Sequence, residues 1–492
     1  MQDRSAANRE EEVRFGTDGW RGVIARDFTF ANVGRAAQAI ADFLRSEDRG
    51  SDPIYTDWGS PCRDASHGVV VGYDTRFLSE AFALHCASIL AQNGIPVVVS
   101  DRFVPTPAVS YAVVDRQAAM GVVITSSHNP PEYNGLKIKA EYGGSAPGSI
   151  TDQVERLLPE HAPSAPDSDT ERVDLVTPYM ARIEELIDRD RLTDSPIHVV
   201  IDSMNGSAQG LVARFLEASN VPLTEIRSTV DVTFGGHGPE PLEKNLGPLR
   251  DAMVVTGSAG RRTIGVVTDG DGDRVSAMDE NGGFIDAHRT YALILRYLVE
   301  ERGWSGPIVV SVNLSDLIRR MAEAYGLEVI ETPIGFKHAA EHIVKGDVLM
   351  AGEESGSFAV RGHIPERDGV YLSLLLSEVL ATSDRAASEL VASLHEAFGP
   401  QEYARRDLHV EERREIVADL TASPPNDFGG RSVRAVETLD GVKLRFENGW
   451  LLFRASGTEP ILRVYCEMAN DAAVQEMLDA AENHARGAQR HA

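Results

Sequence analysis

The sequence is poor in cysteine: its 492 residues include three, Cys62, Cys86 and Cys466. The count is odd and the spacing fits no metal-binding pattern, which argues against a disulfide framework or a zinc module. Such cysteines are typical of a reducing compartment, and we expect all three to be small buried apolar groups.

Long apolar stretches are also missing. No run approaches the ~18 residues needed to cross a bilayer, and the opening MQDRSAANREEE is too polar for a signal peptide. We therefore expect a cytoplasmic protein with no membrane partner.

Basic residues are the third shortage. The chain has 48 basic against 75 acidic residues, a net charge of −27, and only six lysines. Nucleic acid and anionic lipid need a basic footprint, so the balance argues against both as main partners. A small anionic substrate stays compatible, because charges are screened beyond about 8 Å at physiological salt and a few arginines can dominate a cleft. High intracellular salt and GC-rich codon usage explain the lysine-poor surface about equally well.

One pattern recurs six times: a short β-branched run ends in a polar, glycine-rich turn. Continuous apolar runs predict strands buried on both faces of a largely parallel sheet. Helical periodicity between them predicts an α/β architecture, whose functional groups gather at the carboxyl ends of the strands. The runs begin at Gly68, Gly121, His198, Ile264, Pro307 and Val348, and the clearest helical segments are Phe30–Leu44, Tyr291–Glu301 and Leu317–Tyr325.

The length predicts three or four domains at ~150 residues each. Pro159–Ser168 is rich in proline and serine and predicts a linker after the first domain. Ser46–Ser66 resembles a surface insertion. Beyond Gly399 the pattern changes to a small α+β domain, with an Asn-Gly hairpin as its strongest signal. Its predicted strands are Gly441–Phe446, Trp450–Arg454 and Leu462–Glu467, followed by a helix at Ala472–Ala485.

A hydroxyl-rich turn follows the second strand: Thr125-Ser126-Ser127-His128-Asn129-Pro130. A serine is a weak nucleophile unless a base, a metal or a polarising neighbour assists it. Lys137 and Lys139 lie close along the chain and could neutralise a phosphate on this serine. On its own, the stretch fits an Asn-Pro turn whose hydroxyls bond to the backbone somewhat better than a catalytic role.

An acidic turn, Asp269-Gly270-Asp271-Gly272-Asp273-Arg274, follows the fourth strand. Three carboxylates at alternate positions repel one another unless a cation binds them, and oxygen ligands suit Mg²⁺. An EF-hand loop would place its last ligand at Glu280 but needs a helix where this chain has a strand. A haloacid-dehalogenase-type phosphatase, with Asp269 as nucleophile and Asp271 as acid/base, is the other alternative.

Three further turns carry polar groups. Arginine, hydroxyls and glycine near Arg454 form a candidate phosphate cradle. Glu353 and Ser355 suit the vicinal hydroxyls of a sugar, although a helix cap fits them too. Lys337 lies on a glycine-containing turn, where a solvated lysine is the simpler interpretation. The cradle comprises Arg454, Ser456, Gly457, Thr458 and Arg463, and His363 and Arg367-Asp368-Gly369 follow the Glu353 turn.

Together these motifs resemble the α-D-phosphohexomutase family of phosphoglucomutases, phosphomannomutases and phosphoglucosamine mutases. The match runs in family order through nearly the whole chain, from Phe15–Gly22 to Arg463. The resemblance implies three tandem α/β domains with mixed, largely parallel sheets and a smaller C-terminal α+β domain around a central cleft. The implied domains are 1–158, 172–283, 284–395 and 396–492, which carry the phosphoserine, metal, sugar and phosphate sites in that order.

The resemblance also implies roles. Ser127 would carry phosphate, bridged by one Mg²⁺ to Asp269, Asp271 and Asp273. Arg21, Arg274, Lys137 and His128 would surround the phosphoryl group, and Lys337 would act as acid/base or contact substrate. Glu353, Ser355 and His363 would bind the sugar, and Arg454, Ser456, Gly457, Thr458 and Arg463 the phosphate that is not reacting. Hexose 1,6-bisphosphate would be intermediate and activator, and the enzyme a monomer or homodimer acting on small sugar phosphates.

The sugar is the least determined feature. The Thr332–Lys337 and Gly352–Ser355 motifs are closer to phosphoglucomutases, and Trp20 differs from the isoleucine usual in phosphoglucosamine mutases. The compact loop after Arg454 instead resembles bacterial phosphomannomutase/phosphoglucomutases. We expect interconversion of glucose 1-phosphate and glucose 6-phosphate, with a phosphomannomutase or a dual-specificity enzyme as the alternative.

Overall fold

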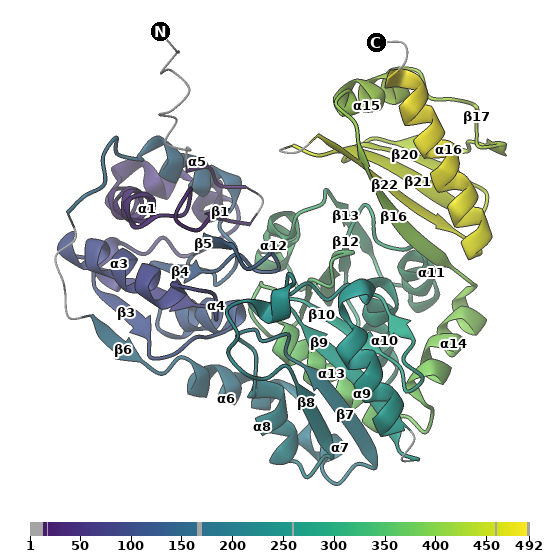
Figure 1. Cartoon of the computed structure of the whole chain (residues 1–492), viewed down its shortest axis with the longest axis horizontal. Helices are drawn as coiled ribbons and strands as arrows, with labels where there is room; N and C mark the ends of the chain where they lie inside the picture. Colours follow the sequence, from purple (N-terminus) through teal and green to yellow (C-terminus); the bar gives the residue numbers. More distant parts are fainter. Residues whose placement is uncertain (1–12, 17, 165–169, 258–259, 458–459, 490–492) are drawn as a thin grey trace.

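The computed structural model describes residues 13–16, 18–164, 170–257, 260–457 and 460–489. Four main sheets follow one another along the chain, each with its own helices (Figure 1). The first three are mixed: parallel pairs make up most of the first and third sheets and half of the second, and the last sheet is antiparallel throughout. This confirms the predicted fold class.

The first sheet has the order β1-β5-β4-β2-β3-β6. The strands from β4 to β6 are parallel, and β5 and β1 extend the sheet antiparallel. Helices α1 (Phe30–Leu44), α3 (Ser79–Gln92), α4 (Thr106–Asp115) and α5 (Gly148–Arg156) belong to this unit. The strands are β1 (Trp20–Val23), β2 (Val69–Tyr73), β3 (Val97–Ser100), β4 (Met120–Ile124), β5 (Tyr133–Lys139) and β6 (Glu171–Val173).

Strand β6 corrects the predicted seam. It follows the Pro159–Ser168 segment, yet it pairs in parallel with β3, with Val98 opposite Glu171. The chain therefore returns to the first sheet after that segment, and the predicted start of the second domain at residue 172 falls inside this strand. The sequence signal missed the short, exposed edge strand that follows this segment.

The second and third sheets have the orders β11-β10-β9-β7-β8 and β13-β12-β14-β15. Their central strands are buried on both faces, as continuous apolar runs predict. The strands are β7 (Ile197–Asp202), β8 (Leu223–Ile226), β9 (Arg262–Thr268), β10 (Val275–Met278), β11 (Phe284–Ile285), β12 (Ile308–Ser311), β13 (Val329–Thr332), β14 (Met350–Gly352) and β15 (Phe358–Val360). The helices are α6 (Val176–Leu186), α7 (Arg189–Leu192), α8 (Leu211–Glu217), α9 (Gly247–Gly257), α10 (Ala287–Glu300), α11 (Asp316–Tyr325), α12 (Phe336–Lys345), α13 (Gly369–Ala381) and α14 (Ala387–Phe398).

The C-terminal sheet, at the upper right of Figure 1, has the order β16-β22-β21-β20-β19. Its strands are β16 (Glu402–His409), β19 (Ala435–Glu437), β20 (Val442–Phe446), β21 (Gly449–Ala455) and β22 (Ile461–Met468), covered by α15 (Arg413–Ala422) and α16 (Asp471–Gln489). One continuous apolar core connects the first three units, whereas this last unit has its own. It meets the third unit through a small cluster: Val312, Trp450, Leu452 and Tyr465.

Two smaller expectations need correction. Cys86 and Cys466 are buried as predicted, but Cys62 is exposed. The 46–66 insertion is not purely superficial, because Arg49 is buried, ion-paired with Glu141, and lies over the Phe43 and Tyr55 rings. Burying a charge is costly unless it is paired, so the pair ties the insertion to the domain.

Candidate functional site

Loops from all four units meet at one cleft of about 530 Å³. Several of these segments leave the carboxyl end of a strand, where α/β sheets place their ligands: the turns at His128, Arg274, Lys337 and Glu353 follow β4, β9, β13 and β14. The lining includes Asp18, Arg21, His128, Glu240, Arg274, Lys337, Glu353, Ser355, Arg367, Arg405, Arg454 and Arg463.

Ser127 lies in the turn after β4 and is buried, with its backbone in the left-handed region at φ 52°. The hydroxyl of Thr125 accepts the Ser127 N–H at 2.9 Å and donates to the Asp74 carboxylate at 2.6 Å. The Ser127 hydroxyl is 2.9 Å from Asp269 Oδ2 and 3.2 Å from His128 Nδ1. The turn thus aims the serine at the acidic cluster of the second unit.

Arg76 fixes this turn from behind. Its guanidinium is buried and donates to the carbonyl oxygens of Ser127 at 2.7 Å and Asn129 at 2.6 Å, and to those of Pro130 and Tyr133. Strained left-handed residues persist only where the surroundings enforce them, and four carbonyl contacts supply that enforcement. The role of Arg76 was missed from the sequence, although the strand-end motif GYDTR contains it.

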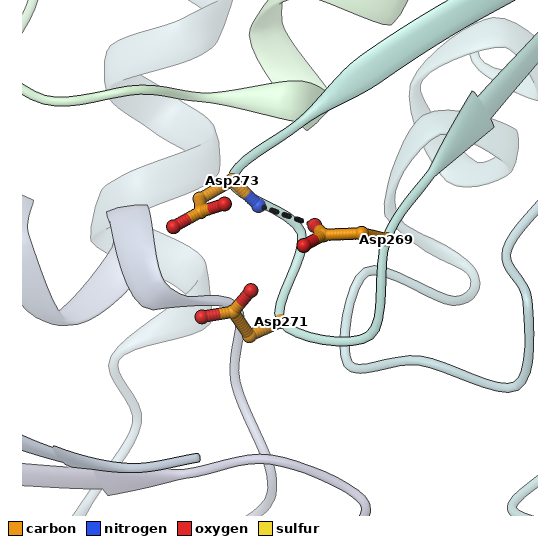
Figure 2. A group of neighbouring side chains, drawn as sticks. All are labelled: Asp269, Asp271 and Asp273. Carbon is orange, nitrogen blue, oxygen red and sulfur yellow. Dashed lines mark hydrogen bonds between the residues drawn. The ribbon is translucent and has the colours of Figure 1, made fainter. Parts of the chain in front are cut away.

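The three aspartates of the acidic turn converge after β9, and ligand oxygens of all three lie within 4.8 Å of one another. Figure 2 shows the carboxylates of Asp271 and Asp273 on one side of the turn and the Asp273 N–H directed at Asp269, whose Oδ1 accepts it at 3.0 Å. A Cβ on Gly270 would lie 2.5 Å from the Ser127 carbonyl oxygen. Glycine is therefore required there for the acidic turn to approach the serine.

Buried cations partly neutralise this cluster. Lys137 Nζ is 2.8 Å from Asp18 Oδ2 and Asp271 Oδ2 and 2.9 Å from Asp273 Oδ2. Burial acts to lower the pKa of Lys137, but the three carboxylates outweigh it and raise the pKa above its ordinary value. Arg367 reaches Asp18 at 2.7 Å and Asp273 at 2.8 Å. Three units therefore share one charge network.

The cluster fits a hard divalent cation. Asp271 Oδ1 and Asp273 Oδ1 are buried and accept no hydrogen bond from the described residues, and such atoms are unfavourable without a partner. Burial, reinforced by Asp271 and Asp273, raises the pKa of Asp269 well above its ordinary value, which also indicates missing positive charge. The donors are all carboxylate or hydroxyl oxygens, which suits Mg²⁺ or Mn²⁺.

The predicted cations surround the serine. Arg21 donates to Asn129 Oδ1 at 2.7 Å, and Arg274 Nε is 3.9 Å from Asp269 Oδ2. Burial, followed by the charges of Arg274 and Arg21, holds the pKa of His128 well below its ordinary 6.5. The ring is therefore neutral at pH 7. Glu240 was missed from the sequence and lies 4.0 Å from His128 Nε2 and 3.6 Å from Arg274.

The third unit supplies Glu353, Ser355 and Lys337 to the cleft. Glu353 accepts the Gly335 N–H at 2.6 Å, just before α12, and burial raises its pKa. Ser355 donates to the Ser357 hydroxyl at 2.9 Å. The hydrogen bond from Gly335 to Glu353 fixes the turn that leads to Lys337. Glu353 and Lys337 are therefore held in place relative to each other at the cleft.

In the C-terminal unit, Arg454 and Arg463 lie opposite each other on β21 and β22 and line the cleft. Ser456 is buried beside them, and α15 arginines hold the loop: Arg413 donates to the Ser456 carbonyl and Arg414 to that of Gly457. Thr458 lies outside the described residues. Arg405 of β16, which sequence reasoning missed, adds a third arginine to this side of the cleft.

Among the described residues that were predicted to bind substrate, His363 lies away from the cleft lining. Its side chain is 2% exposed, bonds to Asp368 Oδ2 at 2.8 Å and packs against the Tyr111, Tyr179 and Tyr371 rings. Asp368 also accepts the Tyr179 hydroxyl and caps α13. Histidine here completes a buried network behind the cleft, so we omit it from the proposed substrate site.

Ser127 lies buried beside an acidic triplet, and four units contribute to the cleft next to it. This arrangement defines an enzyme of the phosphoryl-transfer class. Four family models match: phosphoglucomutase/phosphomannomutase alpha/beta/alpha domain I at 12–163, domain II at 177–283, domain III at 286–398 and the C-terminal domain at 404–484. The chain belongs to the phosphoglucomutase/phosphomannomutase family of hexose-phosphate mutases.

Relatives carry several substrate names. A phosphoglucomutase/phosphomannomutase of Thermococcus kodakarensis is 30% identical, covering 94% of this chain and 96% of its own. A phosphoglucosamine mutase of Methanocaldococcus jannaschii is 30% identical over 84% and 90%. A crystal structure from Thermus thermophilus, provisionally named a phosphomannomutase, is 34% identical with a TM-score of 0.83 over 96% and 99%. Among the described residues, no helix is long and apolar enough to span a membrane.

Proposed function

We propose that this chain is a phosphoglucomutase that interconverts glucose 1-phosphate and glucose 6-phosphate through phosphorylated Ser127 and glucose 1,6-bisphosphate. The observation that carries the proposal is the contact between the Ser127 hydroxyl and Asp269 Oδ2, at 2.9 Å, inside a buried acidic triplet. A phosphate ester at that oxygen would lie against the candidate cation site and beside the buried Lys137 and the partly exposed Arg21 and Arg274.

In the first half-reaction, the substrate's free hydroxyl oxygen attacks the phosphorus on Ser127. The Ser127 Oγ–P bond breaks and a sugar O–P bond forms; the sugar hydroxyl gives up its proton, and the departing Ser127 oxygen gains one to become a hydroxyl again. Lys337 lines the cleft and is the group we assign to that proton or to substrate contact. Phosphoryl transfer passes through a loose transition state, so positioning and charge stabilisation provide most of the catalysis.

The second half-reaction returns the other phosphate to Ser127, which must lose its proton. His128 Nδ1 is 3.2 Å from the Ser127 oxygen, and the lowered pKa leaves the imidazole able to accept that proton at pH 7. We therefore assign His128 to this transfer.

The bisphosphate must turn over between the two half-reactions, so one cradle has to bind either end of the sugar. Arg454, Ser456, Gly457 and Arg463 would hold the unreactive phosphate, while Glu353 and Ser355 would hold sugar hydroxyls. Binding energy from the remote phosphate orients the reacting hydroxyl. The separate core of the C-terminal unit suits a domain that moves during this exchange.

One magnesium ion would be held by Asp269, Asp271, Asp273 and the phosphorylated Ser127. When bound, it would neutralise charge on the transferring phosphoryl group. Glucose 1,6-bisphosphate would act as activator by restoring the phosphoserine when an intermediate escapes. We also predict that the protein is a monomer or homodimer and that it is cytoplasmic.

The decisive experiment incubates the purified protein with Mg²⁺ and glucose 1,6-bisphosphate and locates phosphate by peptide mass spectrometry. We expect a stable ester on Ser127. Ser127→Ala should abolish turnover without unfolding, whereas the matched control Ser126→Ala should retain it, because Ser126 is buried and its hydroxyl bonds to none of the described residues. Unphosphorylated Ser127, or full activity in Ser127→Ala, would refute the proposal. Membership of the mutase family argues against the phosphatase alternative.

The choice of glucose needs its own test, because relatives are named for mannose and glucosamine substrates as well. Rates on glucose 1-phosphate, mannose 1-phosphate and glucosamine 1-phosphate should be compared side by side with the matching bisphosphate. A tenfold preference for either rival, about 1.4 kcal/mol, would overturn the glucose assignment and leave the mutase mechanism intact.

A further inference from the structure

Asp440 joins the phosphate cradle to the third unit. It lies in the β19–β20 turn, and its two carboxylate oxygens accept the Arg454 Nε–H at 3.0 and 2.9 Å. Its Oδ2 also accepts the backbone N–H of Ile334 at 2.9 Å. One side chain therefore contacts a cradle arginine of one domain and a loop of another.

The β19–β20 turn places the Asp440 carboxylate beside Arg454. Gly441 has φ 90°, and a Cβ there would lie 2.2 Å from the Phe453 carbonyl oxygen. The turn can fold this tightly onto β21 only with glycine at that position. Arg454 lies on β21 next to Phe453, so the turn holds Asp440 beside its guanidinium.

The geometry of the Asp440–Arg454 contact leaves Arg454 able to bind phosphate. Asp440 pairs with Nε, so the two terminal nitrogens, which can form a fork for phosphate oxygens, are not used by this contact. A guanidinium fixed through Nε loses less side-chain freedom when phosphate binds.

The Ile334 contact reaches the other half of the site. Ile334 and Gly335 directly precede α12, whose start has no side-chain cap, and Lys337 follows on its first turn. Asp440 binds the Ile334 N–H and Glu353 binds the Gly335 N–H. Two carboxylates from different domains thus brace the loop that carries Lys337.

We propose that Asp440 is a positioning residue that presets Arg454 for the distal phosphate and locks the cradle to the 332–337 loop while the sugar is held. The proposal rests on the proposed mutase function. Loss of Asp440 should weaken distal phosphate binding and let the bisphosphate escape before it turns over.

The test compares Asp440→Asn with wild type and with Asp479→Asn, a control that breaks an exposed ion pair of the same domain, Asp479 with Arg406 at 2.8 Å. For Asp440→Asn we expect a roughly tenfold higher KM for glucose 1-phosphate, about 1.4 kcal/mol, and a higher bisphosphate requirement. The melting temperature and the phosphorylation of Ser127 by bisphosphate should match wild type. Asp479→Asn should behave as wild type throughout.

A double-mutant cycle separates positioning from general damage. In an Arg454→Gln background, Asp440→Asn should change KM little further, because its effect acts through that arginine. If Asp440→Asn folds poorly, Asp440→Glu and Asp440→Gln can replace it, because their side chains have equal length and differ in charge. The ratio of their KM values then measures the contribution of the carboxylate charge to substrate binding.

Unchanged KM and bisphosphate requirement in Asp440→Asn, equal KM values for the Glu and Gln variants, or a full additive loss in the Arg454→Gln background would overturn the inference. Failure of wild-type Ser127 to accept phosphate would instead refute the mutase proposal, so the two failures are distinguishable.

Discussion

Lys137 offers the sharpest test of the charge network. Its ammonium group lies 2.8 to 2.9 Å from carboxylates of Asp18, Asp271 and Asp273. Lys137→Met keeps the length and apolar stem of the side chain but removes the charge. Three buried carboxylates then lose the cation that all three contact.

The expected cost follows from that geometry. Removing one partner of a buried ion pair costs about 3–5 kcal/mol, because the remaining charge stays desolvated. At about 2–4 °C per kcal/mol for a unit of 150–250 residues, the melting temperature of the metal-free variant should fall by roughly 6–20 °C. Mg²⁺ binding only the folded state adds about 2.7 kcal/mol at 100 times its Kd. Since Lys137 no longer competes for the carboxylates, Mg²⁺ should stabilise the variant more than wild type.

Scanning calorimetry with EDTA and with Mg²⁺ measures both effects. Lys139→Met is the matched control: Lys139 is buried two residues along β5, but it pairs with Glu366 at 2.6 Å and with Ser145, outside the acidic triplet. It should lose stability without gaining extra response to Mg²⁺. An unshifted melting temperature in Lys137→Met, or equal Mg²⁺ responses in all three proteins, would contradict the reasoning.

Three other predictions follow from single contacts. Asp271→Asn should weaken Mg²⁺ binding at least tenfold in calorimetric titration while the fold is kept; unchanged affinity would remove Asp271 from the ligand set. Burial, together with Asp316, raises the pKa of Glu467 from 4.5 to about 8. Between pH 4.5 and 8 the folded state therefore holds more protons than the unfolded state, so the free energy of unfolding should fall by up to about 1.4 kcal/mol per pH unit as pH rises. Glu467→Gln should flatten this pH dependence of the free energy of unfolding, measured by denaturant titrations. Because Lys137, Lys139 and Lys443 are buried, the surface has few lysines to offset the net charge of −27, and thermal stability should rise from 0.1 to 1 M KCl; a fall would exclude adaptation to salt.

Most of the fold and site features that the sequence predicted correctly lie at the ends of strands. The runs at Gly121 and Ile264 are β4 and β9, and the polar turns after them meet at Ser127 and Asp269. Two physical rules suffice: continuous apolar runs become central parallel strands, and their carboxyl ends share one edge. Helix α1 matches its predicted bounds, Phe30–Leu44, because its apolar spacing and the Thr29 cap agree.

The errors have a different origin. Strand β6 has three residues and little apolar character, so only its pairing with β3 identifies it. His363 looked like a ligand because histidine near a sugar motif suits one, yet the aromatic rings that enclose it come from α4, α6 and α13. The β3 partner of β6, and the Tyr111 and Tyr179 rings beside His363, lie far along the chain from the positions concerned.

The same reasoning explains which functional residues were missed. Ser127 and Asp269 are recognisable because their chemistry is local: a hydroxyl or carboxylate triplet in a strand-end turn. Arg76 and Asp440 act on the Ser127 carbonyl and the Ile334 N–H, which are 51 and 106 residues away. Arg367 was noted in its motif but was given no role, and each of the three supports a group that a motif does identify. Arg367 contacts Asp18, which is 349 residues away. A buried arginine without a paired carboxylate or carbonyl is too costly to persist. The number of arginines that a cleft needs thus follows from its charge, whereas their positions follow only from the fold.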